Sequence, residues 1–144
     1  TPLVSWQDTR AEPWCARAGS HARELVDATG LVLSPHYAGP KLAALFDEHP
    51  DLRARAEAGL LRFGTLESYL VWHWSGGVAH ETDLSMAART LLVDLATGAW
   101  SPSLCALFGV PPGILGAIAP SFGRRTLLGA AGGFGNVFAF ASAP

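Results

Sequence analysis

The apolar residues of this chain recur at helical spacing in a series of short segments. In residues 40–48, Leu42, Leu45 and Phe46 are three and four positions apart, which places them on one face of a helix. The segment opens with a proline, which is favoured at the first helical position because its missing N–H has no partner there. An amphipathic helix is therefore predicted over residues 40–48, ended at Pro50.

The same spacing predicts further helices, and the strongest of them covers residues 65–74. Thr65 is its predicted N-cap, and Glu67 in the first turn favours the helix dipole. His73 shares the predicted inner face and is expected to be a core histidine. Helices are also predicted over residues 20–28, 51–60 and 101–108, with single turns of helix at residues 85–89 and after residues 111–112.

Strand patterns are few. Residues 3–6 are predicted to form the end of a buried strand, and residues 90–95 to form a second strand followed by a turn. Asp8 and Thr9 are predicted to cap the helix that contains Pro13. Isolated strands among helices are typical of a piece of an α/β domain, so the predicted fold class is α/β, helix-rich with few strands.

Composition narrows the function classes. The chain has 144 residues, enough for one domain with one core, and a net charge of −2. Its basic residues form no stripe, so no nucleic-acid partner is expected. The chain has only two cysteines, Cys15 and Cys105, and shows no signal-peptide pattern, so a cytoplasmic location is expected.

The residues 126–144 are uncharged and rich in glycine. Their apolar run is interrupted by glycines, so no membrane span is expected, and they lack the pattern of a phosphate-binding loop. Hydrophobic residues make up 49% of the chain and charged residues 15%, which leaves little polar surface to cover exposed faces. Self-association is therefore expected, with Phe138 and Phe140 buried against a neighbour or against the helix over residues 65–74.

Four stretches carry the most specific motifs of the sequence: VSWQDTR, TGLVLSPHYAGPKLAALFDE, LLRFGTLESYLVWHWSGGVAHETDLSMAARTLLVDLATGAW and FGVPPGILGAIAPS. In order and spacing they resemble the FGGY family of carbohydrate kinases, with the glycerol kinases as the nearest branch. The resemblance assigns residues 1–123 to part of the family's N-terminal, substrate-binding domain. Residues 124–144 are then a divergent, apolar, glycine-rich tail.

The resemblance implies a partial actin-like, ribonuclease-H-like domain of a kinase that phosphorylates a hydroxyl of a polyol or sugar. ATP and Mg²⁺ are implied for the intact enzyme, and neither is expected to bind this chain alone. The family's Asp-x-Gly-Thr phosphate loop and its Gly-Asp-Gln base are not in the sequence, and no acidic residue follows Asp94. No catalytic residue and no activity of the chain alone are therefore predicted. The alternative is a non-catalytic remnant or interaction module of the same fold.

Two residues are predicted to contact substrate. Trp6 stands where the family places a tryptophan against the carbon skeleton of the substrate, although the residue pattern alone also fits a core tryptophan. His36 stands where glycerol kinases carry a substrate-binding tyrosine, and an imidazole can still hydrogen-bond a hydroxyl. Ala38 and Ala44 also depart from the family pattern, so the resemblance leaves the alcohol open.

The other motif residues are predicted to be structural. Asp8 and Arg10 are expected to pair and to cap the next helix. Lys41 matches a family lysine and is expected to be held by a neighbouring carboxylate at the start of its helix, rather than to bind phosphate. His73 and His80 lie on either side of a Gly-Gly break, which is not a metal-ligand spacing, so no metal site is predicted.

The motif H-x-T-D and the A-R-T that follows it are also predicted to be structural. Thr82 and Asp83 match the first of these motifs, and Asp83 followed by Ser85 is expected to cap the short helix that carries Arg89. The resemblance and the spacing together predict that Arg89 holds this loop through an ion pair with Asp83.

Overall fold

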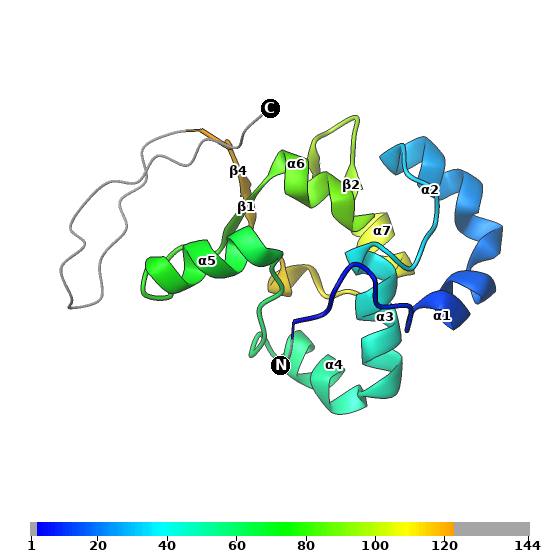
Figure 1. The fold of residues 1–144 in the computed structure, drawn as a ribbon, viewed down its shortest axis with the longest axis horizontal. Helices are drawn as coiled ribbons and strands as arrows, with labels where there is room; N and C mark the ends of the chain where they lie inside the picture. Colours follow the sequence, from blue (N-terminus) through cyan, green and yellow to red (C-terminus); the bar gives the residue numbers. More distant parts are fainter. Residues whose placement is uncertain (1–2, 123–144) are drawn as a thin grey trace.

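The computed structural model describes residues 3–122 and shows short helices joined to two small sheets (Figure 1). The helices are α1 (Glu12–Arg17), α2 (Ala22–Thr29), α3 (Ala38–Glu48), α4 (Pro50–Glu57), α5 (Leu66–Trp74), α6 (Leu84–Ala87) and α7 (Pro102–Leu107), with 3₁₀ turns at Gly19–His21, Ala88–Thr90 and Pro112–Ile114. The strands are β1 (Glu81–Asp83), β2 (Val93–Asp94), β3 (Ala99–Trp100) and β4 (Ala117–Ala119). This confirms the predicted helix-rich α/β class.

The strands form two separate pairs. β1 pairs in parallel with β4, with Thr82 opposite Ile118, and β2 pairs antiparallel with β3, with Val93 opposite Trp100. The strand predicted over residues 90–95 is shorter than expected because Leu91 has a φ of 65°, which takes the backbone out of the extended region.

The strand predicted at residues 3–6 does not form in the described part of the chain. Residues 3–5 are irregular and a turn begins at Trp6, where the carbonyl accepts a hydrogen bond from the Lys41 ammonium group at 3.1 Å. A strand needs a partner along its length, and no strand of the described chain lies beside this segment.

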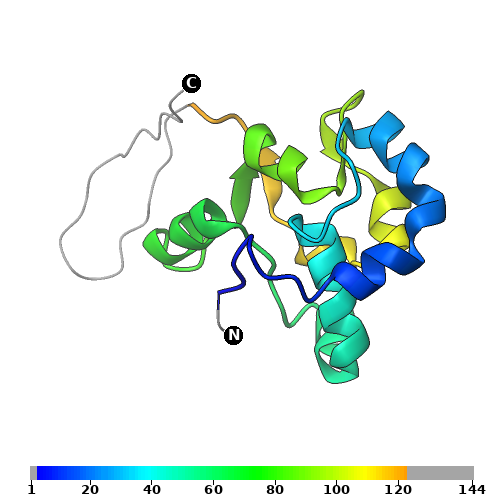
Figure 2. The same cartoon turned by 45° about the vertical axis from the view of Figure 1, so that its right-hand side comes forward.

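The main core lies among α2, α3, α4 and α7 and the segment before β2. Figures 1 and 2 show α1, α2, α3 and α7 gathered on one side of the molecule, with α5, β1 and β4 on the other. Trp14 packs on the buried Phe108 ring at a centroid distance of 4.9 Å, which joins α1 to the core. The buried core residues are Leu25, Ala43, Phe46, Ala56, Leu91, Leu92, Leu104, Cys105, Phe108, Val110 and Ile114.

Helices α2 and α3 confirm the sequence prediction closely. α2 ends at Gly30, whose φ of 67° suits the left-handed C-cap that glycine adopts at low cost. α3 begins two residues earlier than predicted, at Ala38, and ends at the predicted boundary. The predicted caps of α1 are wrong, because its N-cap is Ala11 and the Asp8 carboxylate is occupied by Arg10.

Helix α5 is present where it was predicted, but the face expected to be buried is exposed. Leu66 and Tyr69 are 60% and 55% exposed, and His73 is an exposed residue stacked on Tyr69 at a centroid distance of 6.0 Å. The prediction of a core histidine is therefore wrong. α5 packs against β1 and buries the small Ser68 instead. Because the apolar residues of α5 are spread around the helix, the periodicity of its sequence could not decide which face is inside.

The described residues include no helix that is long and apolar enough to cross a membrane. The predicted burial of Phe138 and Phe140 concerns residues outside the described part of the chain.

The closeness of α3 to Phe108 can be tested at Gly39. A Cβ atom at Gly39 would lie 3.0 Å from the Thr90 carbonyl oxygen and 3.1 Å from the Phe108 ring. We expect Gly39→Ala to lower the free energy of unfolding by about 1–3 kcal/mol because it overpacks the core. Gly19→Ala is the matched control, since a Cβ there would meet nothing within 4 Å. Urea denaturation compares the two variants, and a Gly39→Ala protein as stable as the unmodified chain would contradict this packing.

The cap of α6 gives a second prediction. Asp83 accepts hydrogen bonds from the Met86 amide at 2.9 Å and the Ser85 hydroxyl at 2.7 Å, as predicted. Burial alone would raise the pKa of Asp83, but hydrogen bonds from Ser85, the Met86 amide and Ser121 lower it. We expect Asp83→Ala to cost about 1 kcal/mol of unfolding free energy at neutral pH.

Because the pKa of Asp83 is lower in the folded state, this stabilisation is present above the ordinary aspartate pKa of about 4 and is lost as pH falls through the folded value. Urea denaturation at neutral and acidic pH measures the difference. Asp27→Ala is the control, because its ion pair with Arg23 is loose, at 3.8 Å, and highly exposed. If the loss of unfolding free energy in Asp83→Ala were as large at acidic pH as at neutral pH, a charged Asp83 cap would be contradicted.

Candidate functional site

An open cleft of about 400 Å³ lies at the start of helix α3 and is lined by Trp6, His36, Tyr37 and Arg89. Three separate segments supply these side chains. Trp6 comes from the irregular N-terminal segment, His36 and Tyr37 from the loop before α3, and Arg89 from the 3₁₀ turn Ala88–Thr90. The fold therefore brings the two predicted substrate residues into one cleft and adds two that the sequence did not single out for this role.

The Trp6 indole and the His36 imidazole stack on each other. Their ring centroids are 5.7 Å apart and their planes are 29° apart. Trp6 is 66% exposed, so it is not a core tryptophan. The Nδ1 atom of His36 is 2.7 Å from the Ser34 hydroxyl, which fixes the ring and leaves Nε2 as the nitrogen free to meet a ligand.

Lys41 lies beneath this stacked pair. Its side chain is almost fully buried, and Nζ donates to the Trp6 carbonyl and to the His36 carbonyl, each at 3.1 Å. Burial lowers the pKa of Lys41, while the nearby Asp8 acts in the opposite direction. The expected neighbouring carboxylate is therefore wrong as a hydrogen-bond partner, and two backbone carbonyls take its place.

Asp8 is not available to Lys41 because it is paired with Arg10. The Nε and Nη2 atoms of Arg10 donate to the two carboxylate oxygens of Asp8 at 2.9 and 2.8 Å. The Arg10 side chain and its backbone N–H lower the pKa of Asp8 to about 2. The predicted Asp8–Arg10 pair is thus confirmed, and it closes the turn that leads from Trp6 into α1.

Arg89 does not form the predicted ion pair with Asp83. Its guanidinium lies over the Tyr37 ring, 5.1 Å from the centroid, where the negative face of the ring attracts the cation. Asp83 instead accepts the hydrogen bonds of the α6 cap from Ser85 and Met86. The guanidinium of Arg89 is therefore directed to the cleft, without a carboxylate partner in the described chain.

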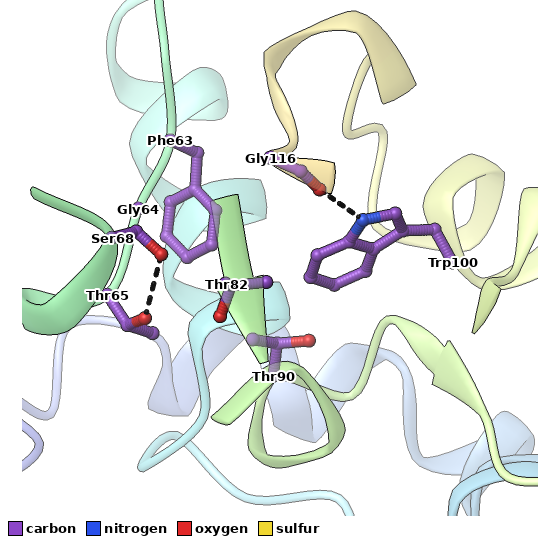
Figure 3. Close-up of a pocket in the computed structure, with 8 residues that line it drawn as sticks. All are labelled: Phe63, Gly64, Thr65, Ser68, Thr82, Thr90, Trp100 and Gly116. Atoms are coloured by element: carbon purple, nitrogen blue, oxygen red, sulfur yellow. Dashed lines mark hydrogen bonds between the residues drawn. The ribbon is translucent and has the colours of Figure 1, made fainter. Parts of the chain in front are cut away.

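A second, much smaller pocket lies between α5 and the β1–β4 pair (Figure 3). Its volume of about 10 Å³ has room for about one water molecule, so it cannot hold a sugar. Figure 3 shows the Trp100 indole N–H directed at the Gly116 carbonyl, a bond of 2.7 Å, and Thr65 beside Ser68. The pocket is lined by Phe63, Gly64, Thr65, Ser68, Thr82, Thr90, Trp100 and Gly116.

Glu67 joins the hydroxyls of this pocket, a role that the sequence analysis missed. Its Oε1 atom accepts hydrogen bonds from Thr65, from Ser68 at 3.2 Å and from Thr82 at 2.7 Å. Thr65 therefore occupies the N-cap position of α5 but uses its hydroxyl on Glu67 rather than on a helix amide. The signal was present in the F-G-T-x-x-S motif, where the hydroxyl residues bracket the glutamate. The cluster ties α5 to β1.

Metal-ligand residues are scattered. Among residues 3–122 no group of three or more histidine, cysteine, aspartate or glutamate side chains lies together. His80 Nε2 is 2.7 Å from the Phe63 carbonyl. Burial raises the pKa of both free thiols, Cys15 and Cys105, so neither is an activated nucleophile.

Most of the sequence matches a known domain. Residues 1–126 match the model of the FGGY family of carbohydrate kinases, N-terminal domain. Glycerol kinase of Methylobacterium nodulans is 44% identical over 122 residues, which are 83% of this chain and 24% of that protein. Glycerol kinase of Nocardia farcinica is 47% identical over 120 residues, which are 82% of this chain and 24% of that protein. The chain thus spans about a quarter of the length of these relatives.

Solved structures give the same fold. Plasmodium falciparum glycerol kinase with ADP superposes with a TM-score of 0.80 at 22% identity, over 84% of this chain and 24% of that one. Gluconate kinase from Lactobacillus acidophilus superposes with a TM-score of 0.76 at 22% identity, over 86% of this chain and 24% of that one. Since the family model covers all the described residues, and the fold agrees with it, the chain belongs to the FGGY family of carbohydrate kinases.

Proposed function

We propose that this chain forms one wall of the substrate site of a glycerol-kinase-like enzyme, which transfers a phosphoryl group from ATP to a hydroxyl of a polyol or sugar. The observation that carries the proposal is the exposed Trp6 indole, stacked on His36 at the mouth of an open cleft. Membership of a carbohydrate-kinase family supports the substrate class, and the glycerol kinases among the relatives support a polyol.

The chemistry of the cleft suits a polyhydroxy compound. A polyol presents C–H groups on one side and hydroxyls on the other, so an aromatic face can cover the first while polar groups bind the second. Trp6 offers that face, His36 Nε2 can accept from or donate to a hydroxyl, and the Arg89 guanidinium can donate. These groups bind and orient the substrate, which is how a kinase places a hydroxyl for attack.

The remaining parts of the reaction are assigned to the intact enzyme. ATP and Mg²⁺ supply the transferred phosphoryl group and neutralise its charge there. The described residues do not fit Mg²⁺, because the cleft is lined by no carboxylate and no cluster of metal ligands lies among residues 3–122. His36 is not proposed as the base, since its role here is to orient a hydroxyl. A cytoplasmic location, as for other consumers of cellular ATP, is part of the proposal.

The first prediction from this function concerns substrate binding. We expect Trp6→Ala to weaken glycerol binding about tenfold, equivalent to about 1.4 kcal/mol, because the apolar wall is lost. Trp74→Ala is the matched control, as an exposed tryptophan on α5 that does not line the cleft. Dissociation constants come from NMR titration with glycerol. Equal weakening by both variants would contradict a substrate role for Trp6.

The residue at position 36 should set the preferred alcohol. We expect His36→Tyr to shift binding toward glycerol relative to longer polyols and pentoses, because it restores the tyrosine of the glycerol-kinase branch while Trp6 remains in place. The same titration, run with glycerol and with xylitol, gives the ratio of the two affinities. An unchanged ratio would show that position 36 does not face the hydroxyls.

The chain alone should release no ADP. It spans about a quarter of the length of its relatives and has no acidic residue after Asp94 to act as base. A coupled ADP-release assay with polyols and pentoses should therefore equal its blank. Turnover above the blank would contradict the assignment of catalysis to the intact enzyme. Inactivity together with a lack of polyol binding would favour the alternative, a non-catalytic remnant or interaction module.

A further inference from the structure

We infer that Lys41 is a positioning residue: its buried ammonium group holds the backbone of Trp6 and the backbone of His36 together, and so sets the stacked pair that forms the cleft. This inference rests on the proposed function for its link to substrate. The positioning itself can be observed without any substrate.

The geometry of the ammonium group is the first argument. Nζ of Lys41 lies 3.1 Å from the carbonyl oxygen of Trp6 and 3.1 Å from that of His36. These two residues are 30 positions apart in the sequence, yet their rings stack at 5.7 Å. One cation therefore binds both backbone segments that carry the two stacked rings.

The N-terminal segment depends on this contact. Residues 3–6 form no strand, and the hydrogen bonds of Ser5, Gln7 and Asp8 close local turns within residues 5–10. The bond from Lys41 to the Trp6 carbonyl, by contrast, crosses from this segment to helix α3. In the described part of the chain, no other hydrogen bond of residues 3–8 crosses to α3 or to the loop before it.

The burial of Lys41 indicates that its contacts do more than fill space. Lys41 is 8% exposed, and lysine is rarely buried unless it is paired. Burying its charge costs free energy, which also lowers the pKa of the group, and two carbonyl oxygens compensate only part of that cost. A methionine would fill the same space without a charge, so packing alone does not require lysine here.

The same contacts exclude direct binding of a phosphate by Lys41 in this conformation. Two of its three N–H donors are used by carbonyls, and the side chain is closed off from the cleft, whose lining does not include it. Lys41 therefore acts on a ligand only through Trp6 and His36.

The test uses NMR on the full chain with three variants. Lys41→Met keeps the side-chain length and removes the donors, Lys41→Arg keeps a positive charge and donors, and Arg17→Met removes a charge from an exposed ion pair with Asp47 as the control. The readout is the nuclear Overhauser effect between the Trp6 indole and the His36 imidazole. The Trp100 indole N–H, bonded to the Gly116 carbonyl, reports independently that the fold is intact.

We expect Lys41→Met to abolish the Trp6–His36 effect while the Trp100 signal stays in place. Lys41→Arg should restore part of the effect, and Arg17→Met should leave it at full strength. A Trp6–His36 effect of full strength in Lys41→Met would overturn the inference.

If Lys41→Met does not fold, the inference can still be tested on the unmodified chain. Lys41 is the only lysine in the sequence, so labelling with ¹⁵N-lysine gives a single Nζ signal. A hydrogen-bonded, buried ammonium should exchange its protons slowly with water and show couplings to the carbonyl carbons of Trp6 and His36. A fast-exchanging ammonium without such couplings would overturn the inference.

Glycerol titration of the same proteins separates this inference from the proposed function. We expect Lys41→Met to weaken glycerol binding at least fivefold and Arg17→Met to leave it unchanged. If the unmodified chain binds no polyol but Lys41→Met still loses the Trp6–His36 effect, the positioning role stands and the proposed function fails. If Lys41→Met binds glycerol normally with the stack intact, the proposed function stands and the positioning role fails.

Discussion

Helix α3 approaches the Phe108 ring so closely that position 39 must be a glycine. Gly39 lies in the first turn of α3, and a Cβ there would sit 3.1 Å from the ring and 3.0 Å from the Thr90 carbonyl oxygen. Burying a ring of this size stabilises the fold by about 1.5–3 kcal/mol, and the contact is possible only because position 39 has no side chain. The position and direction of α3 are thereby set by the core.

The start of α3 places most of the groups around the cleft. His36 and Tyr37 immediately precede the helix, and Lys41 lies in its first turns. The same Thr90 that touches Gly39 ends the 3₁₀ turn that carries Arg89, so the guanidinium is brought over the Tyr37 ring. The side chains of the cleft lie on loops and turns, and the packed helices behind them supply the rigidity, an arrangement that is common in binding proteins.

The sequence predicted elements whose cause is local. α2 and α3 are amphipathic, so their spacing sufficed, and Asp83 caps α6 through atoms within three residues of it. The position of His73 could not be predicted because apolar residues are spread around α5, and only contact with β1 decides which face is buried.

The wrong predictions for Lys41 and Arg89 share a different cause, because the actual partner of each side chain includes residues of another segment. The carbonyls that bind Lys41 belong to Trp6 and His36. Because every residue has a backbone carbonyl, the types of residue in the sequence cannot indicate which carbonyls bind a lysine. Arg89 was paired with Asp83 because the two are close in sequence, whereas its actual partner is Tyr37 in another segment. The family resemblance indicated Trp6 and His36 each as a substrate contact, but their stacking depends on the fold.

The proposed role of the cleft at the start of α3 as a substrate wall can be tested by a crystal structure of the chain grown with glycerol. We expect electron density for glycerol with its C–H side against the Trp6 indole and a hydroxyl within hydrogen-bond distance of His36 Nε2. Density for glycerol only at other surfaces, with the Trp6–His36 cleft empty or collapsed, would contradict it.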